Sequence, residues 1–203
     1  MDMQKKLGER LEFLESAKEP HFIATRSIHQ KAPLEPIHYF SLAILNRSLS
    51  LVYGFVSLVR DNNFVSAAPL VRVQIDNLLR FRAAFLTNDI DGFVTEFTQG
   101  KHIRHMKDRT GNKMTDAYLR TTLSQQYDWL NGLNERASGY VHLSTVHILH
   151  MMSIEPVDDD TAKGFFYVGA DEKFVSNEDY LEVTESMVKV TYFLLESIQD
   201  LVL

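Results

Sequence analysis

Apolar residues recur at three- and four-residue steps along most of the chain, which is the spacing of one face of an α-helix. The pattern predicts helices at about residues 2–19, 37–60, 64–86, 90–99 and 115–130, a further helix that opens near Arg136, and a last helix from residue 177 to the C-terminus. The fold class that follows is all-α, a bundle of six or seven helices.

The segments between these helices are marked by prolines and polar clusters. Three prolines between residues 20 and 36 bracket a stretch that is not expected to be a continuous helix. Residues 165–168 and 173–175 are short apolar runs on either side of Gly169, which is a strand–turn–strand pattern. This pattern adds a small β-hairpin near residues 165–175 to the predicted bundle.

A single helical domain is predicted for residues 1–203, because no linker, repeat or low-complexity tract divides them. Residues 1–36 form its N-terminal helix and Pro-containing connection, and residues 37–203 form the bundle. In the last helix, an apolar stripe runs from Tyr180 to Leu201. This stripe faces a partner, either inside the bundle or in a second copy of the chain.

Composition excludes several functional classes. The formal net charge of −6 argues against a protein that coats nucleic acid over its whole surface, so any such contact needs a local basic patch. The absence of cysteine excludes disulfides, thiolate zinc sites and cysteine nucleophiles, and it fits a reducing cytoplasm. The first residues lack the apolar run of a signal peptide, and no uninterrupted apolar run approaches a membrane span. We expect a soluble, cytoplasmic protein without a membrane partner.

The most basic part of this acidic chain is residues 101–113, which are candidates for contacts to an RNA backbone. The alternative is a solvated loop. Arg72, Asp76 and Arg80 follow at four-residue steps and are expected to form a salt-bridged helix face, with Arg72 as a further candidate phosphate contact. The candidate substrate-binding residues are Arg72, Lys101, Arg104, Lys107 and Arg109.

The segment from Asn134 to His150 concentrates groups that bind anions and move protons. Arg136, Ser138 and His142 lie within seven residues at the predicted opening of a helix. The spacing of Arg136 and His142 resembles the Arg-x(4–6)-His signature of the HEPN superfamily of helical ribonucleases and their inactive relatives. The order of the helices over residues 37–203 is also similar. One departure is Ala137, because many active members carry a polar residue directly after the arginine.

The resemblance implies a metal-independent endoribonuclease, of the kind found in toxins and phage-defence effectors, with an antitoxin or other protein as a partner. In this family two motifs face each other across a homodimer. His142 would then act as general base, Arg136 would stabilise charge on the phosphate, and Ser138 would assist. A helix N-terminus at the motif would add unpaired amides for the phosphate.

Alternatives stay open for this motif. Arg136 is then a surface residue, and His142 is a hydrogen-bonded core histidine. The function that goes with this alternative is a non-catalytic dimerisation or interaction module with a degenerate HEPN motif. Neither His102 with His105 nor His147 with His150 has the surrounding acidic residues of a persuasive metal site, so no metal or cofactor is expected.

Overall fold

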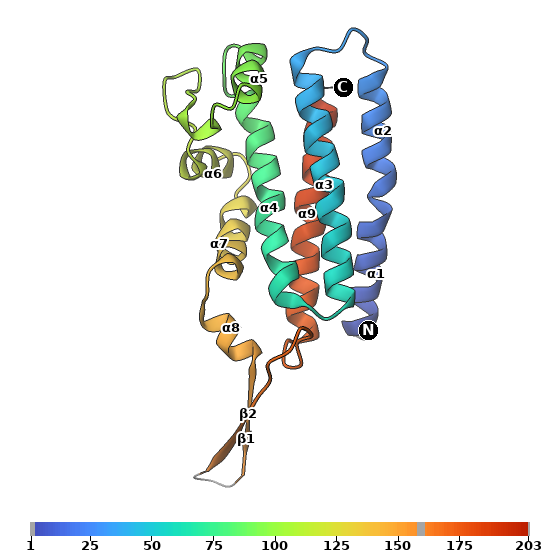
Figure 1. Cartoon of the computed structure of the whole chain (residues 1–203), viewed down its shortest axis with the longest axis vertical. Coiled ribbons are helices and arrows are strands. Elements are labelled where there is room, and N and C mark those ends of the chain that lie inside the picture. The colour runs from blue at the N-terminus through green and yellow to red at the C-terminus, as the bar shows by residue number, and fades with distance from the viewer. Residues whose placement is uncertain (1–2, 158–160, 203) are drawn as a thin grey trace.

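The molecule is a bundle of long helices that carries a layer of short helices on one side and a hairpin at one end (Figure 1). The computed structural model describes residues 3–157 and 161–202. The bundle consists of α1 (Met3–Ser16), α2 (Lys18–His29), α3 (Pro36–Arg60), α4 (Phe64–Ala84) and α9 (Asn177–Val202). The helices α3, α4 and α9 pack on one another, and α1 and α2 pack against α3 and α9.

The second layer packs along α4 and leads into the hairpin. It consists of α5 (Ile90–Thr98), the 3-10 turn η1 (Ile103–His105), α6 (Asp116–Ser124), α7 (Trp129–Val141) and α8 (Thr145–His150). The strands β1 (Met152–Pro156) and β2 (Ala162–Phe166) pair antiparallel, with Met152 opposite Phe166. The predicted fold class, a mainly α bundle with a small hairpin, is confirmed.

The two central helices begin where their sequences satisfy free backbone groups. Pro36 opens α3 at a position where its missing N–H is not needed, and the Glu35 backbone N–H donates to Nδ1 of His38 over 2.8 Å. The Asn63 side chain caps α4 by accepting the backbone N–H of Ser66 over 3.1 Å. The sequence predicted the start of α3 to within one residue, and it predicted the start of α4 at Phe64, where α4 begins.

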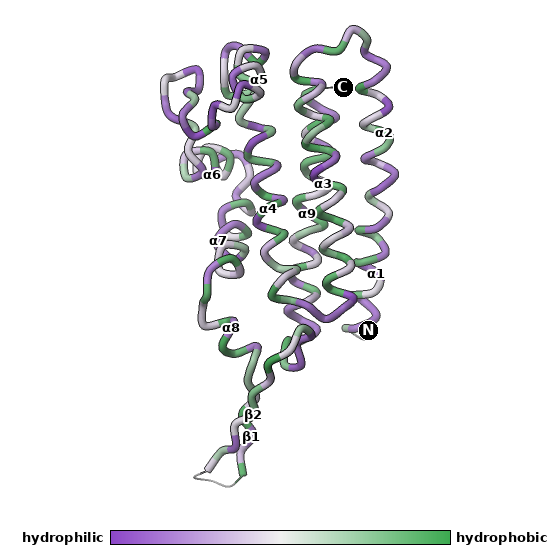
Figure 2. The backbone as a smooth tube through the Cα atoms, in the orientation of Figure 1, coloured by the Kyte–Doolittle hydropathy of each residue, from purple (hydrophilic) through white to green (hydrophobic). Residues whose placement is uncertain are grey.

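The apolar stripe of the last helix lies inside the bundle. Tyr180, Val183, Met187, Val190, Leu194 and Ile198 are all buried. Only Leu201, at the end of the stripe, is exposed, by 39%. Of the two partners that the sequence left open for this seam, the structure therefore selects the chain's own helices. Figure 2 shows hydrophobic positions recurring along the long helices, and also on α8 and the hairpin.

The N-terminal region differs from its prediction. Residues 18–29 form α2, although Pro20 was expected to prevent a continuous helix there. Pro20 lies in the first turn of α2, where a backbone N–H has no helical partner to lose. The buried side chains of His21, Ala24 and Ile28 then hold α2 against the bundle.

The hairpin is present, but it precedes the predicted position. Its second strand, Ala162–Phe166, overlaps the first of the two predicted strands, and its partner is the upstream segment Met152–Pro156. Residues 173–175, predicted as the second strand, form no strand. Short apolar runs do not reveal which neighbour they pair with, because pairing depends on the intervening turn. The predicted polar loop at Asp158 to Asp160 lies outside the described residues.

Of the described helices, α3 is the one long and apolar enough to cross a membrane, judged by length and composition alone. It lies at the centre of the bundle in Figure 1, and its buried residues include Phe55, Val56 and Val59. The core helix of a soluble protein has the same length and composition. The expectation of a protein without a membrane span therefore remains a prediction.

A buried hydrogen-bond network crosses the core. The Nε2 atom of His21 lies 3.0 Å from Oγ of Ser48, which accepts a 2.6 Å bond from Nε2 of Gln74. Gln74 also reaches Thr191 on α9 over 3.0 Å, so one network joins α2, α3, α4 and α9. Polar side chains in a core have to be satisfied together, and the network therefore fixes the relative positions of these helices.

We predict that His21 makes stability depend on pH. Burial lowers the pKa of His21 below 6.5, against the opposing effect of its bond to the Ala17 carbonyl. The unfolded chain therefore binds a proton that the folded chain does not, and the free energy of unfolding falls as the pH drops below about 6.5, with a slope of at most about 1.4 kcal/mol per pH unit. Urea unfolding at several pH values should show this fall in wild type and in His29→Gln, an exposed histidine, but not in His21→Gln. An identical fall in His21→Gln would assign it to other groups.

Candidate functional site: the Arg136–His142 motif

The motif lies in the second half of α7 and not at the opening of a helix. The residues Asn131 and Gly132 predict a break between the helix ending near residue 130 and the motif helix, but this prediction is wrong, because α7 begins at Trp129 and runs through both residues. A glycine inside a helix costs only about 1 kcal/mol, and the buried side chains of Leu130 and Leu133 hold this part of α7 in place. The chain instead breaks between Ser124 and Trp129, where α6 ends.

His142 therefore lies at the carboxyl end of its helix. It is the residue at which α7 ends, and its backbone is extended. The free groups at this end of a helix are carbonyl oxygens, which repel a phosphate. The predicted contribution of helix N-terminal amides to anion binding is wrong for this position. Ser138 and His142 also do not share a helical face, because the helix ends before His142.

The His142 imidazole is exposed and, within residues 3–157 and 161–202, makes no hydrogen bond or ion pair. Three other histidines have polar partners. His21 is buried and hydrogen-bonded, Nδ1 of His147 accepts the backbone N–H of Ser144, and Nε2 of His150 lies 3.7 Å from a carboxyl oxygen of Asp179. The alternative of a hydrogen-bonded core histidine at position 142 is therefore wrong.

Arg136 is a half-exposed side chain with an acidic partner. Its Nε lies 3.0 Å from Oε1 of Glu182 on α9, and the two side chains are 55% and 53% exposed. They line a shallow hollow of about 360 Å³ together with Trp129, Glu185 and Lys189. A phosphate at Arg136 has to compete with Glu182 for the guanidinium.

The two residues between Arg136 and Gly139 have local structural roles. Ala137 is buried, with 1% exposure, on the face of α7 that packs on α4. The position directly after the arginine therefore faces the core and not solvent. The Ser138 hydroxyl donates to the carbonyl of Asn134 over 2.8 Å. In this conformation the hydroxyl proton points back along the helix.

Sequence reasoning missed the aromatic cluster that holds the motif to the bundle. Phe64, at the start of α4, makes edge-to-face contacts with Tyr140, His150 and Tyr180, at ring-centre distances of 5.4, 5.0 and 5.3 Å. Burial raises the pKa of the Tyr140 hydroxyl, and the nearby negative charge of Glu182 raises it further. No local pattern in the sequence shows this cluster, because its four rings come from four helices.

The basic segment 101–113 does not form one surface. The Arg109 guanidinium donates to the backbone carbonyls of Phe85 and Leu86, so it ties the loop to the end of α4. Lys107 and Arg109 line a hollow beside the start of α5, whereas Lys101 and Arg104 line another hollow between α3, α4 and α6. For Arg109 the structural alternative is correct.

The loop that contains Lys107 and Arg109 is ordered by Asp108. Desolvation opposes ionisation of Asp108, but hydrogen bonds from Tyr118, Asn112 and Thr110 hold the pKa of its carboxyl down to about 2. A carboxylate bonded in this way fixes the turn that follows it. This part of the basic segment is therefore a folded structural loop.

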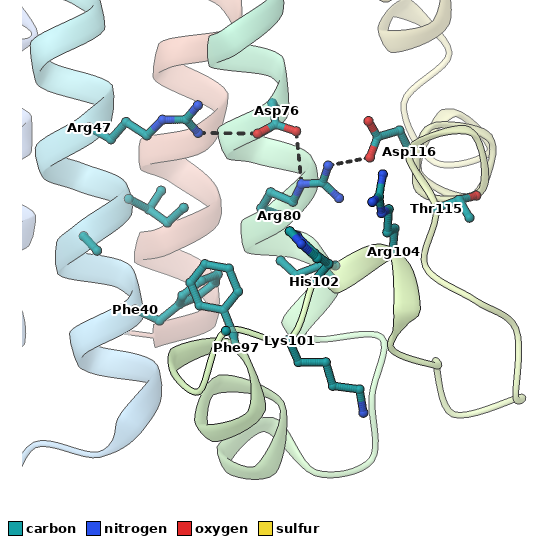
Figure 3. Close-up of a pocket in the computed structure, with 14 residues that line it drawn as sticks. Phe40, Arg47, Asp76, Arg80, Phe97, Lys101, His102, Arg104, Thr115 and Asp116 are labelled. Atoms are coloured by element: carbon teal, nitrogen blue, oxygen red, sulfur yellow. Dashed lines mark hydrogen bonds and ion pairs between the residues drawn. The ribbon is translucent and has the colours of Figure 1, made fainter.

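The expected charge ladder on α4 is present in part (Figure 3). Nε of Arg80 lies 3.0 Å from Oδ1 of Asp76, and a second nitrogen of Arg80 pairs with Asp116 at the start of α6. Arg72 lies 3.8 Å from Asp116 and is not paired with Asp76. Asp76 is also reached by Arg47, at 3.4 Å.

The motif and the basic segment are therefore separate within one chain. The residues that line the hollow of Arg136 come from α7 and α9, or immediately precede α7, and those around Lys101 and Arg104 come from α3 to α6 and the connections between them. The two sets share no residue. Arg136 therefore lies in a different hollow from Lys101 and Arg104.

An exposed apolar surface begins at the motif. Of the 18 large apolar side chains that are exposed in the described part of the chain, ten lie in residues 141–168. They are Val141, Leu143, Ile148, Leu149, Met151, Ile154, Val157, Phe165, Phe166 and Val168. We call residues 141–168 the arm, because Figure 1 shows α8 and the hairpin extending away from the end of the bundle.

The described residues hold no group of three or more histidine, aspartate or glutamate side chains arranged for a metal ion. Comparisons of the chain with protein-family models, with curated proteins and with solved structures found no match.

Proposed function

We propose that the protein is a HEPN-like, metal-independent endoribonuclease that acts as a homodimer. The observation that carries the proposal is the exposed imidazole of His142, which makes no hydrogen bond or ion pair in residues 3–157 and 161–202 and lies six residues after Arg136. A general base has to be accessible to its substrate and not committed to another hydrogen bond, and His142 meets both conditions. Histidine also titrates near neutral pH, as this role requires.

The proposed reaction is an internal transesterification. His142 removes the proton of a ribose 2′-hydroxyl, and the 2′-oxygen forms a bond to the adjacent phosphorus. The bond to the 5′-oxygen of the next nucleotide breaks, which leaves a 2′,3′-cyclic phosphate and a new 5′-hydroxyl that takes up a proton. Arg136 stabilises the additional negative charge on the phosphate oxygens, after release from Glu182.

The homodimer is proposed because ten large apolar side chains of the arm are exposed. An isolated two-stranded hairpin is marginal in water, and here the side chains of β2 are all exposed. Large apolar patches of this kind mark interaction surfaces. A second copy packed on the arm would cover Leu143 and place its own Arg136 and His142 near those of the first copy, so the site is completed by two chains.

In its cellular setting the proposed enzyme is a cytoplasmic toxin or phage-defence effector that another protein, such as an antitoxin, restrains. The competing function is a non-catalytic interaction module that uses the same arm. It is favoured by the Arg136–Glu182 ion pair and by the buried side chain of Ala137, which leaves no polar group directly after the arginine. The two functions differ in whether RNA is cut.

Incubation with single-stranded RNA in excess EDTA separates these functions. We expect wild-type protein to cut the RNA at an unchanged rate in the chelator and to leave 2′,3′-cyclic phosphate ends, identified by mass spectrometry of the fragments. Substrate with a 2′-deoxyribose at each position should resist, because it lacks the attacking oxygen. Cleavage that stops in EDTA, or no cleavage by the purified homodimer, contradicts the proposal and leaves the interaction module.

A further inference from the structure

A hollow of about 710 Å³ lies between α3, α4, α5 and the start of α6, away from the motif (Figure 3). This volume is within the range of about 300–1,000 Å³ typical of sites for small molecules. One wall is apolar and another is charged, which is the usual division between the body and the head group of a ligand.

The apolar wall is built from two helices and η1. Phe40 on α3 and Phe97 on α5 meet edge-to-face with ring centres 5.3 Å apart, and Ala43, Ile44 and Ile103 extend this wall. Phe97 is exposed, although Phe40 beneath it is buried. A flat ring or a short hydrocarbon chain on this wall would remove the exposed face of Phe97 from water.

The charged wall favours an anion. Four cations, Arg47, Arg80, Lys101 and Arg104, line the hollow with two carboxylates, those of Asp76 and Asp116. The local excess is positive although the chain as a whole carries a net charge of −6. A site with this local charge attracts anions from solution.

Two of these cations, Arg80 and Arg104, have guanidinium N–H donors without a protein partner in the described chain. Arg80 is fixed by Asp76 and Asp116, yet its buried Nη1 has no hydrogen-bond partner in residues 3–157 and 161–202. Arg104 pairs with no carboxylate of the described chain, since its Nε contact is Nε2 of His105 at 3.3 Å. By contrast, Lys101 is already paired with Glu96, at 2.8 Å.

We propose that this hollow binds a small organic anion. Its carboxylate or phosphate group lies between Arg80 and Arg104, and its aromatic or aliphatic body lies on the Phe40–Phe97 wall. The acceptor oxygens then accept hydrogen bonds from the guanidinium groups of Arg80 and Arg104. The proposal is independent of RNA cleavage, because the hollow shares no residue with the one that contains Arg136.

Calorimetric titration with three probes tests both parts of the ligand. The probes are 2-naphthoate, 2-naphthyl phosphate and the neutral 2-naphthylmethanol, which share the body and differ in the head group. We expect both anions to bind and the alcohol to bind at least about tenfold more weakly, which corresponds to about 1.4 kcal/mol. The tighter of the two anions identifies the head group that the site prefers.

Two variants with matched controls locate the binding. Arg104→Gln removes the cation that has no carboxylate partner in the described chain, and we expect it to lower the affinity for both anions about tenfold. Arg26→Gln, at another exposed arginine, should leave the affinity for both anions unchanged. Ala43→Trp fills the hollow from its exposed edge and should abolish binding. Ser50→Trp, two turns further along α3 and outside the hollow, should not.

Three results would overturn the proposal. The first is equal affinity for the alcohol and the anions, which removes the role of charge. The second is unchanged affinity in Arg104→Gln or in Ala43→Trp, which places the probes elsewhere. The third is no binding of either anion at concentrations up to about 10 mM, well above the Kd expected of a functional small-molecule site.

Discussion

Replacement of His142 by alanine is expected to lower the rate of RNA cleavage by about 10²–10⁴-fold, because the 2′-hydroxyl loses its general base. The same change should alter the free energy of unfolding by only about 0.5 kcal/mol, since the ring is exposed and makes no bond in the described part of the chain. Single-turnover cleavage assays and urea unfolding of the same preparation measure both quantities.

His29→Ala is the matched control for this loss. His29 is likewise exposed and lies in the last turn of its helix, but it is far along the chain from the motif. We expect it to retain the full rate. An equal loss in both variants, or an unchanged rate in His142→Ala, would remove His142 from the reaction.

A mixture of two inactive variants tests whether each site takes residues from both copies of the homodimer. If each site takes groups from both copies, a mixed dimer of Arg136→Ala and His142→Ala chains contains one site with both residues intact. Mixing the two inactive proteins should then restore part of the activity. Recovery that fails although the chains exchange, shown by energy transfer between labelled copies, would place both residues of a site on one chain.

Replacement of Phe64 by alanine is expected to cost about 3–5 kcal/mol of unfolding free energy, the usual loss for a large buried aromatic. Phe64 is 1% exposed and is the ring on which Tyr140, His150 and Tyr180 converge. The variant therefore also loosens α7 and α8 from the bundle. Urea unfolding gives the global loss, and amide hydrogen exchange should show the larger local increase in residues 129–150.

Phe22→Ala provides the comparison for Phe64. Phe22 is the same residue type on α2 but is 42% exposed, and its loss should cost less than about 1 kcal/mol. A cost for Phe64→Ala as small as that of Phe22→Ala would mean that the aromatic cluster does not hold the motif helix. Exchange that increases equally in α1 and α7 would mean that the effect is not local.

The helices of the bundle could be read from the sequence because each depends on local spacing and local capping. The stripe from Tyr180 to Ile198 repeats at helical steps over about five turns, and Asn63 and Pro36 mark the starts of their helices directly. The hairpin was anticipated from its apolar runs. Its position and its first strand, Met152–Pro156, were not, because no local pattern shows which segments of a chain pair as strands.

The start of the motif helix was predicted wrongly for a related reason. Asn131-Gly132 resembles a break, but the packing of Leu133 and Ala137 against α4 outweighs the small local cost of the glycine. Local propensity amounts to tenths of a kcal/mol per residue, whereas each buried side chain contributes more. Where the two disagree, tertiary contacts decide the boundary.

The sequence by itself determined the helical class, the position of most helices, and which residues carry charge and proton-transfer chemistry. Only the tertiary structure decided that His142 is exposed, that Arg136 meets Glu182, and that Lys101 and Arg104 face a different hollow. The physical reason is range. Helix periodicity depends on neighbours within four residues. The surroundings of a side chain depend on helices far away in the sequence, as α9 is from Arg136, and no local pattern shows how those helices pack.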